Sequence, residues 1–406
     1  MLGLYYTIFD TGGEDAEHFT LTIFQENCTR NCTRFTVIQL FGRITPFHEP
    51  GDTPQNETYA GSGWAQPAPE LPEGWLLWHS YSDYSALDSR LFLRSPDGET
   101  QEIVGSFIHA MNGSFGKTPE QIVFMAIDPD ADEWDIFRCD NGTVTNLTQN
   151  SGFRNEDPKW SPDGKQIVFK RGHWDSSADD FVYDLALMDA ETGAVTMLTD
   201  DRAEQAMPCF SADGKYLCYT EYADRIGSII RMDLQTGKTE TVFSESGVNA
   251  YYPVPYGSML YFTKWYSAEN RCDCIMQYDG RSAEPLPFDS ADFDCSDACP
   301  VPGGMICCST KNGTYDLYFY DGEQFMPLTE ISSGQNDLGA CFFPLVRGDV
   351  NADGVCDRAD AEALQNWLLS KPDAAVPVPE AADLDADGKL TAADLSLLKQ
   401  VALQDA

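Results

Sequence analysis

Two stretches, DPKWSPDGKQIVFKR at residues 157–171 and AMPCFSADGKYLCYTEY at residues 206–222, are copies of one unit. Each has an apolar segment, a turn built on Asp-Gly and a second strand-like segment. Such a turn is typical of a β-hairpin, because glycine adopts the left-handed backbone conformation at no steric cost. Two further strand-like segments follow each copy, at residues 181–200 and 228–245. The repeat therefore predicts a four-stranded antiparallel unit of the size of one β-propeller blade.

Weaker copies of this unit extend in both directions and begin at residues 74, 120, 259 and 304. The N-terminal residues fit a blade that lacks its innermost strand, while the segment near residues 340–346 looks like a spare innermost strand. Pairing these two segments would close the ring and remove exposed sheet edges. We therefore expect a mainly β chain whose residues 1–346 form a seven-bladed propeller, with six or eight blades as alternatives.

The segments WSPDGKQIVF and SADGKYLCY, with the DLQTG that follows, resemble the repeat of TolB-type β-propellers. The resemblance extends over most of residues 60–330 and implies a propeller fold. It leaves the function open, because such propellers serve as binding platforms, as accessory domains of enzymes and, less often, as enzymes.

The charge and composition exclude several classes of partner. The chain has 65 acidic and 26 basic residues, and its net charge is −39. This charge repels phosphate backbones and anionic membrane surfaces. No apolar run reaches the roughly 18 residues that a membrane-spanning helix needs. We therefore expect no nucleic-acid partner and no membrane insertion.

The segment DVNADGVCDRAD at residues 349–360 has oxygen-bearing residues at the spacing of a calcium loop, and DLDADGKLTAAD at residues 383–394 repeats it. Such loops bind Ca²⁺ through positions 1, 3, 5, 7, 9 and 12, with glycine at position 6. The sequence predicts two calcium ions. Their ligands, of which Val355 and Lys389 act through the backbone carbonyl, are Asp349, Asn351, Asp353, Val355, Asp357, Asp360, Asp383, Asp385, Asp387, Lys389, Thr391 and Asp394.

An amphipathic helix is expected after each loop but not before it, because the preceding residues are strand-like or rich in proline. Without an entering helix to move, the calcium is expected to be structural, with binding coupled to folding. This duplicated loop and helix, in a small α-helical module at residues 348–406, resembles a type I dockerin. The resemblance implies a cohesin domain of a scaffoldin as partner and a secreted, extracellular, cellulosome-associated protein, although no signal peptide is visible.

By the same resemblance, the residues that read the cohesin lie at loop positions 10 and 11 and on the following helix. They are Arg358, Ala359, Gln365, Asn366, Ala392, Ala393, Lys399 and Gln400. The Ser/Thr pairs that the family often carries at positions 10 and 11 are missing, which suggests a ruminococcal-like rather than clostridial-like cohesin. The two sets also differ from each other, so two equivalent docking orientations are less expected.

Aromatic and acidic residues alternate in the expected connections between the second and third strands of the blades. Aromatic rings stack on sugars and carboxylates accept hydrogen bonds from hydroxyl groups. We therefore expect this rim to bind plant cell-wall carbohydrate. The candidate ligand-binding residues are Trp78, His79, Tyr81, His173, Trp174, Trp265 and Tyr266.

No complete catalytic motif is present, since both G-x-S-x-G and H-E-x-x-H are missing. No catalytic residue can be named, and a binding role is favoured over an enzymatic one. Two alternatives remain open. Rim histidines could hold a metal in a polysaccharide lyase or another glycoside-active enzyme, or the propeller could be a protein-interaction platform.

Overall fold

The structure of the protein is a computed structural model. It describes residues 4–9, 18–25, 36–41, 71–130, 133–176, 180–200, 203–223, 226–266 and 272–402. The chain divides into two units, residues 1–66 and 67–406. In the first unit, β1 (Leu4–Phe9), β2 (His18–Gln25) and β3 (Thr36–Phe41) form an antiparallel sheet in that order.

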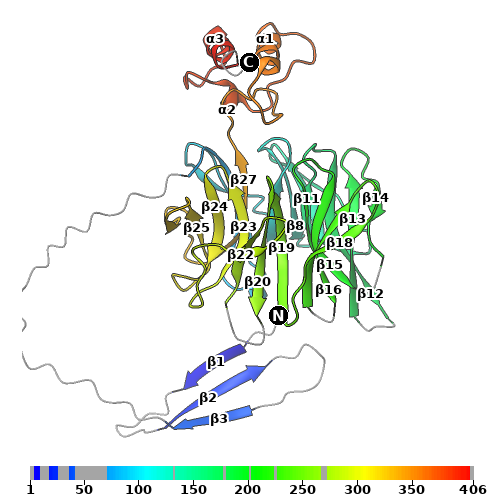
Figure 1. Cartoon of the computed structure of the whole chain (residues 1–406), viewed down its shortest axis with the longest axis vertical. Coiled ribbons are helices and arrows are strands. Elements are labelled where there is room, and N and C mark those ends of the chain that lie inside the picture. The colour runs from blue at the N-terminus through cyan, green and yellow to red at the C-terminus, as the bar shows by residue number, and fades with distance from the viewer. Residues whose placement is uncertain are drawn as a thin grey trace, which may run out of the picture. The chain divides into compact units, whose positions relative to one another are not determined.

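Six four-stranded antiparallel sheets, the blades of a propeller, make up most of the second unit (Figure 1). We name each blade by its innermost strand. From the innermost strand outward, the blades are β27 (Asn336–Pro344), β4 (Gly74–Tyr81), β5 (Arg90–Arg94) and β6 (Thr100–Ile103); β7 (His109–Phe115), β8 (Gln121–Ile127), β9 (Asp135–Asp140) and β10 (Thr143–Asn146); β11 (Arg154–Trp160), β12 (Gln166–Asp175), β13 (Asp180–Asp189) and β14 (Val195–Met197); β15 (Glu204–Phe210), β16 (Tyr216–Ala223), β17 (Ile226–Asp233) and β18 (Thr239–Phe243); β19 (Val248–Tyr256), β20 (Met259–Tyr266), β21 (Cys274–Tyr278) and β22 (Ala283–Pro285); β23 (Cys295–Val301), β24 (Gly304–Ser309), β25 (Asp316–Tyr320) and β26 (Phe325–Pro327).

The two strongest repeats form the predicted hairpins. β11 pairs with β12 and β15 pairs with β16, and the turn glycines Gly164 and Gly214 both have φ of +68°. The second strand of each hairpin is apolar along most of its length because neighbouring blades cover both of its faces. Ile167 and Phe169 of β12, for example, pack in one buried cluster with Val123 of β8. Contacts of this kind hold neighbouring blades together.

The prediction of seven blades is wrong, because the described strands form a propeller of six blades. A C-terminal strand does close the ring, but β27 pairs with β4, placing Phe342 opposite Leu76, and not with the N-terminal strands. The segment that begins at residue 74 supplies only the three strands β4, β5 and β6 to its blade. β4 is buried along nearly its whole length, so its inner edge requires a covering strand. The N-terminal strands pair with one another instead.

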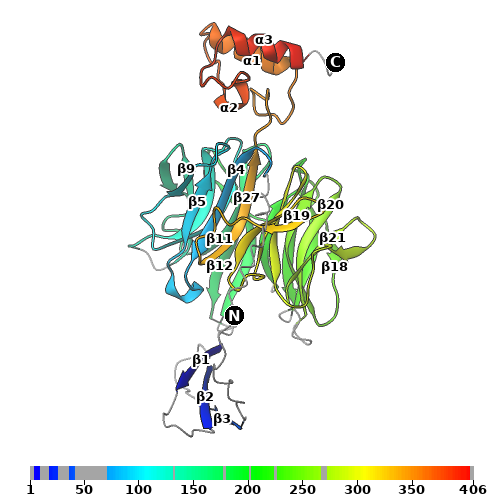
Figure 2. The ribbon, with the colours of Figure 1, turned by 90° about the vertical axis from the view of Figure 1, so that its left-hand side faces the viewer.

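The C-terminal module consists of two loops and three helices, α1 (Arg358–Leu368), α2 (Pro379–Ala382) and α3 (Ala392–Val401). Figure 2 shows α1 and α3 running side by side. Leu364 of α1 and Leu398 of α3 are fully buried in a small core that includes Val350 and Ala382. The two repeats therefore pack face to face through their helices, as their matching positions in the sequence require.

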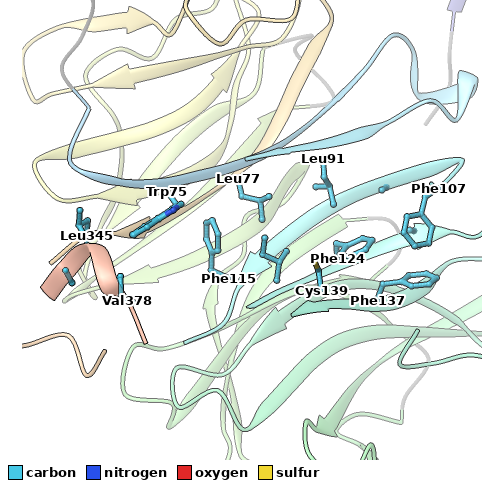
Figure 3. Close-up of a cluster of buried hydrophobic side chains, with 14 residues drawn as sticks. Trp75, Leu77, Leu91, Phe107, Phe115, Phe124, Phe137, Cys139, Leu345 and Val378 are labelled. Atoms are coloured by element: carbon cyan, nitrogen blue, oxygen red, sulfur yellow. The ribbon is translucent and has the colours of Figure 1, made fainter. Parts of the chain in front are cut away.

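The residues after β27 also belong to the propeller core. Leu345 and Val378 lie in one apolar cluster with Trp75 and Phe115 (Figure 3). Arg347 Nε pairs with a carboxylate oxygen of Glu73 at 3.0 Å, and the same guanidinium donates to two backbone carbonyls of the α2 region. The C-terminal module thus follows the ring-closing strand directly and shares apolar contacts with it.

Candidate functional site

The two predicted calcium loops have the same hydrogen-bond pattern. The Asp349 carboxylate accepts bonds from the backbone N–H groups four and five residues further on, at 3.0 and 2.8 Å. Asp383 repeats this arrangement at 3.1 and 2.8 Å. Gly354 and Gly388 have φ of 90° and 77°, as the sharp turn at position 6 requires. The residues that the sequence places at position 1 therefore organise both loops.

The last acid of each loop joins the loop to its helix. Asp360 and Asp394 are fully buried. Asp360 Oδ1 accepts from the Val350 N–H and Oδ2 from the Asp357 N–H, both at 2.7 Å, and Asp394 makes the two equivalent bonds at 3.0 and 2.8 Å. Asp357 and Thr391, predicted at loop position 9, accept N–H bonds at 2.6 and 3.0 Å as helix N-caps. Helix start and loop are thus one structural unit.

Carboxylate oxygens gather inside the second loop. Asp383, Asp385 and Asp387 each offer one oxygen within 4.8 Å of the others. Desolvation raises the pKa of Asp385, and repulsion from Asp387 acts in the same direction. In the first loop Asn351 takes the place of Asp385 and supplies an amide oxygen. Hard oxygen donors that repel one another in this way fit a Ca²⁺ ion.

The predicted cohesin-reading residues lie on the surface of α1 and α3. Arg358, Ala359, Ala392, Ala393, Lys399 and Gln400 are exposed, while Gln365 and Asn366 are half-buried. Lys399 Nζ donates to Gln365 Oε1 at 3.0 Å, so the two repeats meet at this point. The residues of both sets are therefore available on one helical pair.

The candidate ligand-binding residues of the propeller lie on three different blades and do not form one site. Trp78, His79 and Tyr81 belong to β4, His173 and Trp174 to β12, and Trp265 and Tyr266 to β20. Trp174 is 53% exposed and Trp265 is 38% exposed. The side chain of Tyr266 lies outside the described residues. Among the candidates whose side chains the structure describes, only His173 and Trp174 line the same groove.

Trp78 and His79 are not surface residues. Trp78 is 2% exposed and packs in the core beside Phe92. His79 is 3% exposed, and its Nδ1 accepts a hydrogen bond from the Asn112 N–H at 3.4 Å. Burial lowers the pKa of His79 to about 3, so it is a neutral acceptor at ordinary pH. Both side chains are inaccessible to a rim ligand because β4 is covered on both faces.

A groove of about 400 Å³ lies at the rim of the β11 blade. Trp174 meets Phe181 edge to face at 5.4 Å between ring centroids, and the 38% exposed Phe153 meets His173 edge to face at 6.4 Å. The polar groups of Glu133, Asp135, Asn150 and Arg154 also line this groove. Exposed aromatic faces beside carboxylates, an amide and a guanidinium suit a ligand with an apolar face and several hydroxyl groups.

Comparison with known protein families identifies both parts of the second unit. The sequence profile of the TolB beta propeller domain matches residues 78–299, more than half of the chain.

The chain belongs to the TolB β-propeller family. A second profile, the dockerin type I domain, matches residues 347–401, so a type I dockerin follows the propeller. No curated protein matches the sequence. Both resemblances noted in the sequence are confirmed.

Solved structures support the fold of the TolB-like propeller. TolB from Acinetobacter baumannii is 15% identical with a TM-score of 0.54, and the match covers 84% of this chain and 82% of that one. The Kuenenia stuttgartiensis hydrazine synthase is 11% identical with a TM-score of 0.56, over 67% of this chain and 46% of that one. At these identities the likeness concerns the fold alone.

The dockerin gives the chain its clearest functional assignment. A type I dockerin implies attachment to a cohesin domain on a cellulosome scaffold, and it suggests an extracellular protein. Type I dockerins bind calcium, which agrees with the oxygen donors gathered in its loops. None of the helices in the described ranges is long and apolar enough to cross a membrane.

Sequence reasoning missed half of the groove on the TolB-like propeller. Phe153 lies in the link before β11 and Arg154 is the first residue of that strand, whereas Trp174 lies next to the end of β12. The start of β11 lies beside the end of β12 because the two strands are antiparallel, so the aromatic residue at 153 was a usable signal. The pairing of these two segments across one blade is what brings the residues together.

Proposed function

We propose that the protein is anchored to a cohesin-bearing scaffold by a dockerin holding two calcium ions, and that its propeller binds plant cell-wall carbohydrate. The observation that carries the carbohydrate part is the groove around Trp174, where an exposed indole lies beside Phe153, His173 and polar side chains. The dockerin supports it, because cellulosome components act on plant fibre.

Sugar recognition in this groove uses two kinds of contact. The Trp174 indole, 53% exposed, offers an apolar face for the C–H side of a pyranose ring. The carboxylates of Glu133 and Asp135 accept hydrogen bonds from hydroxyl groups, and Asn150 can both donate and accept. Arg154, which pairs with Glu133 at 4.0 Å, offers further donors. Trp265 on the β19 blade is a second candidate contact for a longer chain.

Replacing Trp174 with alanine is expected to weaken glycan binding about 5- to 10-fold, because a stacked aromatic contact contributes about 1 kcal/mol or somewhat more. Titration calorimetry with soluble plant cell-wall oligosaccharides measures the change. Trp367→Ala is the matched control, since Trp367 is a similarly exposed indole on the dockerin. Failure of all such oligosaccharides to bind would contradict the carbohydrate function, and the rim would then favour a protein ligand.

Cohesin docking is proposed to use Arg358, Ala359, Gln365 and Asn366 with Ala392, Ala393, Lys399 and Gln400. A long side chain at an exposed alanine of this face should block the partner without disturbing the dockerin fold. Ala359→Arg or Ala393→Arg is therefore expected to reduce cohesin affinity at least 10-fold. Binding assays against ruminococcal and clostridial cohesins measure this, and a ruminococcal-like partner is expected.

Ala194→Arg is the control for the cohesin experiment, because Ala194 is also exposed but lies in the propeller. Equal cohesin binding by all three variants would show that the partner uses another surface. An effect of only one dockerin variant would indicate a single docking orientation.

A further inference from the structure

Each innermost strand has a β-bulge at the equivalent position along the central channel. In β27 the register with the second strand shifts between Leu338 and Cys341, and the other five strands shift at the matching place. The first bulge residues, all with φ between 52° and 64°, are Gly339, Asn112, Asp157, Met207, Tyr252 and Asp297. Five of the six are not glycine, so this left-handed backbone carries strain. Bulges redirect side chains and are common beside functional sites.

These bulge residues line a cavity of about 300 Å³ in the channel. A second layer of side chains lines the cavity two residues after the first bulge residue of each strand. This layer contains Lys159 and the thiols of Cys209, Cys299 and Cys341. Trp160, Phe210 and Phe342 are among the aromatic walls. The volume lies at the lower end of small-molecule sites, which excludes a polymer and favours a compact ligand.

Two carboxylates face this cavity from opposite sides. Asp157 and Asp297 belong to the third and sixth blades when the β27 blade is counted first. Asp157 is 8% exposed and accepts a hydrogen bond from Asn112 Nδ2 at 2.7 Å, while Asp297 accepts one from the Gly339 N–H at 3.1 Å. In the described part of the chain, neither carboxylate has a cation within 4.0 Å. Burial raises the pKa of both groups, and nearby lysines oppose this rise.

Lys159 brings a positive charge into the next layer. Burial raises the pKa of two carboxyl groups and two thiols on three of the innermost strands. The positive charge of Lys159 lowers the pKa of each of these four groups, which are Asp157, Cys209, Asp297 and Cys299. Lys159 lines the same cavity as Asp157, Asp297 and these two thiols. Among the described residues it has no carboxylate within 4.0 Å. The buried indole N–H of Trp160 also has no hydrogen-bond partner there.

We propose that this cavity binds a zwitterion the size of a dipeptide, with its ammonium between Asp157 and Asp297 and its carboxylate at Lys159. The backbones of the two layers are two residues apart along each strand, which is roughly 7 Å. The termini of an extended dipeptide are also about two residues apart, whereas the charges of a single amino acid are closer together. Apolar side chains of the ligand would contact Trp160, Phe210 and Phe342. This site is separate from the carbohydrate groove at Trp174.

Titration calorimetry on the full calcium-loaded chain tests the proposal with Ala-Phe, Ala-Leu and Ala-Lys. We expect binding that weakens at least 10-fold when the peptide is N-acetylated and at least 10-fold when its carboxylate is amidated. In Asp297→Asn, the free and the N-acetylated peptide should bind equally well, because the carboxylate that pairs with the peptide ammonium is gone. In Lys159→Gln, the free and the amidated peptide should bind equally well, because the ammonium that pairs with the peptide carboxylate is gone. Asparagine tolerates positive φ, so the Asp297 variant should fold.

Trp174→Ala is the control and should leave dipeptide affinity unchanged, which separates this site from the proposed carbohydrate function. Absence of measurable heat for all three dipeptides at millimolar concentration overturns the proposal. So does equal affinity for free and acetylated peptides, or binding that neither the Asp297 nor the Lys159 variant alters.

Discussion

Removing calcium is expected to abolish the helices of the dockerin while the propeller keeps its β-sheets. α1 has 11 residues and α3 has 10, and helices of this length are marginal in water without tertiary contacts. Their shared core is small and centres on Leu364 and Leu398. A core of this size rarely stabilises a module by itself. The cation that neutralises the loop carboxylates therefore has to supply much of the folding free energy.

Single ligands should show the same dependence. Replacing Asp349 or Asp383 with alanine removes a predicted charged oxygen ligand and the acceptor of two backbone N–H bonds. The expected loss is several kcal/mol for the loop concerned, on the scale of metal-coupled folding. Circular dichroism at 222 nm during EDTA and calcium titrations measures the loss. Glu380→Ala is the control, because it removes an exposed carboxylate of the same module outside both loops.

The propeller's own strands provide an internal reference in that experiment. Its blades have buried clusters of their own, and the one around Tyr219 and Ile230, for example, contains no residue of the loops. Helicity that persists in excess chelator would contradict the ligand assignment for both loops. Loss of helicity in Glu380→Ala comparable to that in the ligand variants would attribute the effect to surface charge in general.

The sites differ in how far apart their residues lie in the sequence. This separation decides which of them could be predicted from the sequence. Every predicted calcium ligand of one loop lies within 12 residues, so spacing alone is enough to predict the set. The rim groove combines Phe153 with Trp174, and the channel combines residues from all six innermost strands. Those combinations depend on the register in which strands pair and on where β-bulges shift that register. The periodicity of the sequence does not show where a bulge lies.

Strand length explains the mixed outcome for the rim tryptophans. Trp78 and Trp174 both lie in second strands and looked alike in the sequence. β12 has 10 residues and Trp174 is next to its end, beyond the part that neighbouring blades cover. β4 has 8 residues, and Trp78 lies in its middle. The same type of residue is therefore exposed on the β11 blade, as Trp174, and buried on the β27 blade, as Trp78.

The blade count depended on one pairing. The sequence pattern predicted a missing first strand only for the N-terminal segment, whereas in the structure the segment from residue 74 is the one that the C-terminal strand completes. Burial decides in favour of the second, because seven of the eight residues of β4 are buried. Leaving the inner edge of such a strand open would leave its backbone N–H and C=O groups unpaired away from water.

Deleting β27 is therefore expected to unfold the whole propeller and not only to remove one strand from it. The strand covers β4 along its length, and Phe342 and Phe343 pack into the clusters on either side of the first blade. A chain that ends at residue 335 lacks this strand and leaves the ring open. The expected loss is comparable with the whole free energy of unfolding of a domain, about 5–15 kcal/mol. Thermal unfolding followed by circular dichroism measures it.

A chain that ends at residue 346 is the matched control, because it also lacks the dockerin but keeps β27. It loses the contacts of Val378 and Ala381 with the propeller core, as the shorter chain does, so its melting temperature should fall much less than that of the shorter chain. The difference between the two truncations isolates ring closure. A point variant tests the same contact without truncation. A Cβ at Gly74 would lie 2.4 Å from the Phe343 carbonyl oxygen and 2.5 Å from the Phe342 ring, so Gly74→Val should lower the melting temperature. Equal melting of both truncated chains would mean that β4 is stable without its partner, and the six-bladed closure would be wrong.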